Sequence, residues 1–271
     1  MADDSLFLID IDKILQTKAP KHYKYIPKFV VSYLKRIVHQ EELNVFLRDS
    51  KDKVGVDFLG ACLEFLDAKL EVKGLENIPK DGLYTFVSNH PLGGPDGIAL
   101  ISFLGKYYPD LKFPVNDILL NLKNLNNIFL PVNKHGGMSR EAVKAIASAY
   151  TSDNQIIMFP AGLCSRKIKG KIEDLEWQKN FIVEAVKHQR DIVPIYISGQ
   201  NSNFFYNLSN FRKRIGLKAN IEMLWLPKEA FKKKNETLTL KIGKPISWQS
   251  FDKSKKPKEW AKEVREILYR L

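Results

Sequence analysis

Apolar side chains recur at helical spacing in two stretches near the start of the chain, with charged residues between them. In the first stretch they are Ile26, Val30, Val31, Leu34, Ile37 and Val38. In the second stretch one side of a helix would carry Val54, Phe58, Cys62, Phe65, Leu66 and Leu70. The pattern predicts that residues 1–69 form a helical segment, followed by a second domain over residues 70–271.

From residue 70 onward, short apolar runs alternate with longer helical patterns, and turn residues separate them. The runs predict strands at 70–72, 83–87, 113–115, 129–132, 155–159, 192–198, 221–226 and 238–242. Helices are expected after Asp96, from Asp117, from Ser139 to Tyr150, from Leu175 to His188, and from Pro257 to Leu271. This alternation is typical of an α/β fold. We therefore expect a mixed, largely parallel sheet flanked by helices, with an N-terminal helical extension.

The chain is strongly basic, with 43 lysines and arginines against 31 aspartates and glutamates and a formal net charge of +12. Such a surface can attract an anionic membrane, an acidic carrier protein or nucleic acid, or it can simply be well solvated. None of the basic clusters lies in a recognisable nucleic-acid module, so nucleic acid is not an expected partner. The basic helix that begins near Pro27 can lie on a membrane surface or pack against the rest of the protein, and the sequence leaves both open.

The sequence carries no pattern typical of export or membrane insertion. It opens with the acidic stretch Met1-Ala2-Asp3-Asp4 and has no run of about eighteen apolar residues. Its two cysteines, Cys62 and Cys164, form neither a disulfide framework nor a metal-site spacing. We therefore expect a peripheral protein at the cytoplasmic face of the cell membrane, without a signal peptide, a transmembrane helix or a bound metal.

A turn rich in glycine and proline contains the most informative pair of residues. His90 and Asp96 lie in this turn, between a predicted strand and a predicted helix, where α/β folds commonly place their chemistry. A carboxylate beside a histidine can fix its tautomer and stabilise its cationic form. The pair could act as a general base and its orienting partner in acyl transfer to a hydroxyl that the substrate supplies. The alternative is that both residues only cap the following helix.

Three further segments carry candidate residues for binding. Lys134 lies in a glycine-containing loop before a predicted helix, an arrangement that can bind an anion or be a plain flexible loop. The turn Phe159-Pro160-Ala161-Gly162 is followed by Ser165 and Arg166, which can hold an anionic group or lie as polar surface residues. The apolar pair Val193-Pro194 predicts a strand at a sheet edge or a bulge, and it can line a pocket or pack in the core.

Together these four segments resemble, in their order along residues 70–245, the conserved blocks of the PlsC-like glycerolipid acyltransferases. The resemblance implies an O-acyltransferase that moves a fatty acyl group from a thioester to the hydroxyl of a lysolipid in membrane lipid biosynthesis. It implies catalytic roles for His90 and Asp96. It implies acceptor binding by Lys134, Gly162, Ser165 and Arg166, and a pocket lined by Pro160, Val193 and Pro194. The acyl donor would be acyl-carrier protein or coenzyme A as a cosubstrate, with no resident cofactor.

Several positions depart from the family pattern. The spacing between His90 and Asp96 is one residue longer than usual, Ala161 and Cys164 replace a glutamate and an arginine, and Lys134 replaces an arginine. Arginine grips phosphate as a planar fork, whereas lysine acts as a point charge. Within the family the pattern is most similar to bacterial enzymes that acylate lyso-ornithine or lyso-glycine lipids, whose acceptors present a carboxylate. The alternatives are a 1-acylglycerol-3-phosphate acyltransferase and a non-catalytic membrane lipid-binding protein on the same fold.

Overall fold

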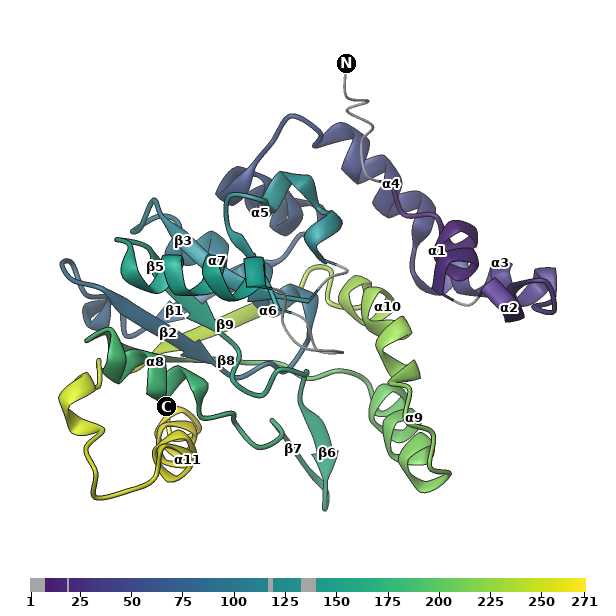
Figure 1. Cartoon of the computed structure of the whole chain (residues 1–271). Helices are drawn as coiled ribbons and strands as arrows, with labels where there is room; N and C mark the ends of the chain where they lie inside the picture. Colours follow the sequence, from purple (N-terminus) through teal and green to yellow (C-terminus); the bar gives the residue numbers. More distant parts are fainter. Residues whose placement is uncertain (1–7, 19, 117–118, 133–139) are drawn as a thin grey trace.

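A seven-stranded sheet forms the centre of the protein (Figure 1). The computed structural model describes residues 8–18, 20–116, 119–132 and 140–271. The strands of the sheet are β1 (Lys69–Lys73), β2 (Tyr84–Ser88), β3 (Leu111–Val115), β4 (Phe129–Pro131), β5 (Gln155–Met158), β8 (Asp191–Ile197) and β9 (Thr237–Ile242), in the order β1-β9-β8-β2-β5-β3-β4. Only the β8–β9 ladder is antiparallel among these described strands. The predicted mixed, largely parallel α/β sheet is confirmed.

Helices cover both faces of the sheet because alternate strand residues point in opposite directions. On one face Phe86 and Ile157 share a core with α5 (Gly55–Phe65) and α6 (Gly94–Leu104). On the other face Val87, Ile156 and Ile192 lie under α7 (Arg140–Thr151), α8 (Asn180–Lys187) and α11 (Pro257–Leu268). In Figure 1, α8 and α11 lie on the opposite side of the sheet from α5.

The expected N-terminal helices are present as α1 (Ile11–Lys18), α2 (Pro20–Tyr23), α3 (Lys28–Ile37) and α4 (Gln40–Asp49). Beside them lie α9 (Asn203–Arg214), the 3₁₀ turn η4 (Ile221–Trp225) and α10 (Leu226–Phe231), on the right of Figure 1. Trp225 packs against the small core that α1 and α3 form around Val31 and Ile37. The N-terminal helices and the α9–α10 segment therefore meet along one side of the molecule.

Three predicted elements differ from the structure. The predicted strand at 221–226 is wrong, because these residues form η4 and begin α10, where Pro227 in the first turn favours a helix. The helix expected from Asp117 is replaced, within the described residues, by the 3₁₀ turns η2 (Leu119–Asn121) and η3 (Lys123–Leu125). The helix expected from Leu175 begins only at Asn180.

A short antiparallel hairpin, β6 (Arg166–Ile168) and β7 (Lys171–Glu173), was not predicted at all. Two more 3₁₀ turns, η1 (Leu75–Asn77) and η5 (Trp248–Ser250), complete the elements. The hairpin projects from the sheet in Figure 1, and its two ends lie close to the end of β2.

Pro194 is in the interior strand β8, so the predicted sheet edge is wrong, whereas the predicted bulge is present. The β8–β9 ladder pairs Ile195 with Ile242, but its next bridge joins Ile192 to Ile246, which leaves one extra residue on the β9 side. The ring of Pro194 packs against Gly243, where an added Cβ would lie 2.9 Å from the proline Cγ. A proline without an N–H donor is tolerated at this break in the ladder.

Candidate active site

The turn after β2 brings His90 and Asp96 together. His90 follows the end of the strand by two residues, and Asp96 lies in the first turn of α6. His90 Nδ1 is 2.9 Å from Asp96 Oδ2, and the His90 side chain is 19% exposed whereas that of Asp96 is fully buried. Asp96 Oδ2 also accepts hydrogen bonds from the backbone N–H groups of Leu92 (2.8 Å) and Gly93 (2.9 Å).

Gly93 shapes the turn between His90 and Asp96. Its backbone has φ 94° and ψ −118°, a conformation that residues with a Cβ rarely adopt. An added Cβ would also lie 3.1 Å from Leu226 of α10. The longer spacing therefore closes into a turn that still directs the Asp96 carboxyl toward His90.

Burial is the largest influence on the carboxyl of Asp96, and it raises the pKa of this group above its usual value. The hydrogen bond and charge of His90, together with the N–H groups of Leu92 and Gly93, act in the opposite direction. These donors hold the Asp96 carboxyl directly beside the imidazole of His90. This is an arrangement that suits a histidine base.

Aromatic side chains hold the plane of the imidazole. The His90 ring stacks on Phe159, with ring centroids 4.3 Å apart and an interplanar angle of 14°. Phe159 in turn contacts Phe113 edge-on, at 5.4 Å and 90°. Phe159 follows β5 directly, so the strand next to β2 in the sheet supplies the surface on which His90 rests.

The main chain of His90 is held by the two ends of the β6–β7 hairpin. Its N–H donates to Asp174 Oδ1 (3.1 Å), and its carbonyl accepts from the N–H of Ser165 (2.7 Å). Ser165, which the sequence assigned to acceptor binding, is 2% exposed and donates its hydroxyl to Asp174 Oδ1 at 2.6 Å. The structure therefore places Ser165 beneath His90 with its hydroxyl already engaged.

Arg166, also assigned to acceptor binding, is in a buried ion-pair cluster. Its side chain is 1% exposed, with one guanidinium nitrogen 2.9 Å from Glu222 Oε1 and another donating to the Cys164 carbonyl at 2.6 Å. Arg212 binds the other oxygen of Glu222 at 2.6 Å. Burial opposes ionisation of Glu222, but Arg212 and Arg166 outweigh it and keep the pKa of this carboxyl below its usual value. The structure places the Arg166 guanidinium in this cluster instead of at an open anion site.

The remaining candidates lie around these residues. Gly162 has φ 65° and donates its N–H to the Phe159 carbonyl, and Pro160 accepts from the N–H of Gln178. Val193 is fully buried in the core of the sheet. Pro194 is also buried. Lys134 lies outside the described residues.

The two cysteines lie in environments unsuited to nucleophilic chemistry. Burial raises the pKa of the Cys164 thiol and raises the pKa of Cys62 to about 12. In the described ranges, histidine, cysteine and acidic side chains do not gather in groups of three or more that could bind a metal ion. The His90–Asp96 pair thus remains the candidate acid–base pair among the residues that the structure describes.

Sequence reasoning missed Asp174, which links the hairpin to His90. Its carboxylate also accepts from Trp177 Nε1 at 2.9 Å. No local motif marks it, because it lies 84 residues from His90 in the chain. The sequence around Asp174 offers only a tryptophan three residues later, and an aspartate and a tryptophan at this spacing do not indicate a function.

Comparison with known proteins identifies the family to which the chain belongs. The family model described as Acyltransferase matches residues 13–271, so the chain belongs to the acyltransferase family and is an acyltransferase. It is 60% identical to the lyso-glycine lipid O-acyltransferase of Bacteroides thetaiotaomicron and 59% identical to the protein of the same name from Phocaeicola vulgatus. These matches cover all of this chain and 100% and 98% of those proteins.

A solved structure is also similar to this chain. It is the crystal structure of the 1-acyl-sn-glycerophosphate (LPA) acyltransferase PlsC from Thermotoga maritima, with 20% sequence identity and a TM-score of 0.47. The match covers 96% of this chain and 94% of that chain.

Proposed function

We propose that this enzyme transfers a fatty acyl group from an acyl thioester to the hydroxyl of a lyso-amino-acid lipid, with lyso-glycine lipid as the acceptor. The observation that carries the proposal is the His90–Asp96 pair, which lies at the carboxyl end of a central strand. The names of the two relatives support the choice of acceptor, because the identity to each extends over the whole chain.

In the proposed mechanism His90 is the general base. Because Nδ1 faces Asp96, Nε2 is the nitrogen that accepts the proton of the acceptor hydroxyl. The hydroxyl oxygen attacks the thioester carbonyl, so that a C–O bond forms and the C–S bond then breaks. The proton passes from Nε2 to the departing thiolate, which leaves as the free thiol. Asp96 stabilises the imidazolium between these steps, and backbone N–H groups near the conserved blocks stabilise the tetrahedral oxyanion.

Engagement of Arg166 by Glu222 supports a carboxylate acceptor over a phosphate. Two cations could bind a phosphomonoester, but the guanidinium of Arg166 is held inside the ion-pair cluster. Lys134 then supplies the positive charge for the acceptor, and a single ammonium suits a singly charged carboxylate. Lysophosphatidic acid remains the alternative acceptor, and a direct assay separates the two.

In this proposal the lysolipid acceptor reaches the site from the cytoplasmic face of the cell membrane. Phe29 of α3 is 75% exposed and Phe211 of α9 is 59% exposed, and ring contacts of Trp225 with Tyr33 and Phe204 join the two helices. The described part of the chain contains no helix that is both long and apolar enough to cross a bilayer. Exposed aromatic rings on a protein of net charge +12 support peripheral binding to anionic lipid.

The experiment that tests the proposal measures thiol release from palmitoyl-coenzyme A and palmitoyl-acyl-carrier protein. Lyso-glycine lipid, lyso-ornithine lipid and lysophosphatidic acid are offered in parallel. Both donors are acidic, so the basic surface is compatible with either, and the assay identifies which one is used. We expect release with the lyso-glycine lipid, and a loss of about 10²- to 10⁴-fold in kcat for His90→Ala.

His188→Gln is the matched control, because His188 lies at the end of α8, where it pairs with Glu184. Full activity in His90→Ala would refute the assignment of the base. Release with lysophosphatidic acid alone would replace the proposed acceptor. Vesicle binding by folded protein without thiol release from any pair of substrates would favour a non-catalytic lipid-binding protein.

A further inference from the structure

Asp174 is the centre of a buried hydrogen-bond network beneath His90. The residue is 2% exposed, and its carboxylate accepts from three donors. Oδ1 accepts from the His90 N–H at 3.1 Å and from the Ser165 hydroxyl at 2.6 Å, and Oδ2 accepts from Trp177 Nε1 at 2.9 Å. The carboxylate therefore links His90, which lies 84 residues away in the sequence, to the nearby residues Ser165 and Trp177.

The network fixes both polar main-chain groups of His90. Asp174 holds the N–H, and the Ser165 N–H holds the carbonyl. Ser165 and Asp174 are the residues on either side of the β6–β7 hairpin, and the hydrogen bond between them closes its base. The neighbouring Asn89 is held in the same way, because its side-chain amide exchanges two hydrogen bonds with the backbone of Ile197. The end of β2 is thus anchored from two sides.

The C-terminal helix holds Asp174 in place. The N–H of Asp174 donates to the Tyr269 hydroxyl at 2.9 Å, and its carbonyl accepts from Arg265 at 2.9 Å. Arg265 also pairs with Glu173 at 2.9 Å. Arg265 of α11 and Tyr269 at the end of this helix therefore position Asp174. None of these contacts involves His90.

We propose that Asp174 is a positioning residue for His90: through the His90 backbone it sets where the imidazole lies relative to the acceptor hydroxyl. This proposal rests on the proposed function, in which His90 is the base. The physical reason is that a general base works only within hydrogen-bond reach of the proton, and a shift of about 1 Å can cost about 10²-fold in rate.

The test variant is Asp174→Asn, which keeps the volume of the side chain. Its amide has one acceptor oxygen and one donor nitrogen in place of two acceptor oxygens. In one orientation the NH₂ group of the amide faces Trp177 Nε1, and in the other it faces the His90 N–H and the Ser165 hydroxyl. Either orientation therefore places a donor against a donor. We expect kcat to fall by about 10- to 100-fold while KM for both substrates stays within about twofold.

A merely structural role is separated by combining this change with His90→Ala. If Asp174 acts through His90, Asp174→Asn lowers kcat in the wild-type background and leaves the residual turnover of His90→Ala unchanged. An equal fall in both backgrounds would overturn the proposal. Asp191→Asn is the matched control, because Asp191 also accepts a backbone N–H, from Trp248, but lies at the opposite end of the sheet, where β8 begins.

Ser165→Ala keeps the proposal testable if Asp174→Asn does not fold. It removes only the hydroxyl that shares Asp174 Oδ1, so we expect a fall of several-fold in kcat that again disappears in the His90→Ala background. Unchanged kcat in a folded Asp174→Asn protein, or in Ser165→Ala when it is the only folded variant, would overturn the proposal. Full activity of His90→Ala would instead show that the proposed function itself has failed.

Discussion

The burial of Asp96, the proposed partner of His90, has a cost in stability when its carboxyl is ionised. Its pKa is raised by burial above the ordinary value of 3.8. The folded state therefore binds more protons than the unfolded state when the pH lies between 3.8, the pKa in the unfolded chain, and the higher pKa in the folded protein. The contribution of Asp96 to the free energy of unfolding falls as the pH rises through this interval. Wherever Asp96 is ionised, the folded protein therefore contains a buried charge that lowers its stability.

Asp96→Asn is expected to separate the effects of Asp96 on stability and on turnover. The amide oxygen can still accept from Leu92 and Gly93, but the buried charge is gone, so the free energy of unfolding at pH 7 should not decrease. Turnover should fall by about 10²- to 10⁴-fold, because the imidazolium loses its partner. The difference in stability from the wild type should shrink as the pH is lowered to about 4. Chemical denaturation over this pH range, with kcat at neutral pH, checks both effects. A large loss of stability at pH 7 would contradict the argument.

The residues of the site differ in how far a sequence can reveal them. His90 and Asp96 lie in one short turn, so their proximity follows from the spacing alone. Ser165 and Arg166 are candidates because of their chemical type and the family resemblance, but their partners Asp174 and Glu222 come from other parts of the chain. A charged side chain is open to a ligand only if no buried partner of opposite charge reaches it. That depends on how the hairpin packs against α9 and η4, which the sequence pattern did not predict.

The turn between β2 and α6 depends on one of its two adjacent glycines. Gly93→Ala should lower the free energy of unfolding by about 1–3 kcal/mol, because φ 94° strains a residue with a Cβ and Leu226 lies 3.1 Å away. Turnover should fall with it, since Asp96 is held by this turn. Gly94→Ala is the matched control, because its Cβ would meet no atom within 4 Å. Thermal and chemical unfolding of both variants measures the contrast, and equal destabilisation would contradict it.

Elements that follow a hydrophobic period were predicted well, and elements set by distant partners were not. The strands at β2, β5 and β8 are short apolar runs that the sheet buries on both faces. The segment 221–226 has a similar apolar character, but Glu222 must reach the two arginines on β6 and α9, and the chain turns as a 3₁₀ helix to place it there. The β6–β7 hairpin is mostly polar, so it has no hydrophobic pattern that would predict two strands. The hydrogen bond between its two ends, Ser165 and Asp174, holds it in place.

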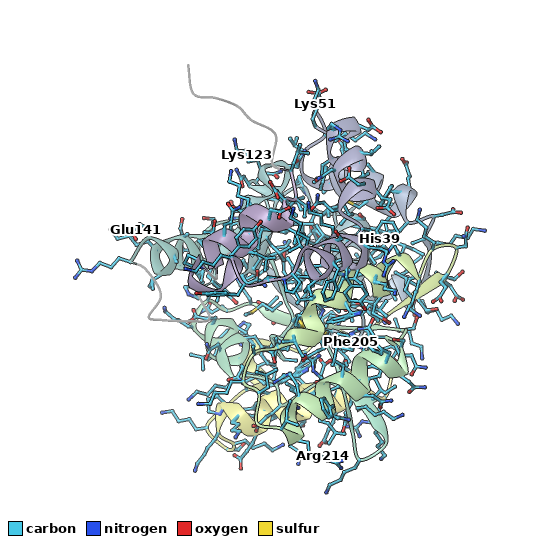
Figure 2. The ribbon with its side chains drawn as sticks, turned by 90° about the vertical axis from the view of Figure 1, so that its right-hand side faces the viewer. His39, Lys51, Lys123, Glu141, Phe205 and Arg214 are labelled. Atoms are coloured by element: carbon cyan, nitrogen blue, oxygen red, sulfur yellow. The ribbon has the colours of Figure 1, made fainter. Side chains whose placement is uncertain are left out.

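Across the whole molecule, α3 and α9, which both carry exposed apolar side chains, lie on one side. Figure 2 faces this side and shows Arg214 at its lower edge, at the end of α9. Phe211 of α9 and Ile215 at the C-cap of this helix are 59% and 58% exposed and lie about one turn apart, with Lys213 and Arg214 between them in the sequence. Apolar side chains next to cations fit the interface of an anionic membrane. Because α10 packs against Gly93, this side also lies next to the turn that holds His90 and Asp96.

This arrangement predicts that α9 contributes to membrane binding. Phe211→Ser should weaken binding to vesicles that contain anionic lipid by about 10- to 100-fold, because burial of a large apolar side chain contributes about 1.5–3 kcal/mol. Val183→Ser is the control, since Val183 is 40% exposed on α8, which covers a face of the sheet away from α9. Binding should also weaken as salt is raised, because the net charge of +12 acts through screened electrostatics. Vesicle co-sedimentation at low and high salt measures both effects. Equal losses for the two variants would place the membrane contact elsewhere on the molecule.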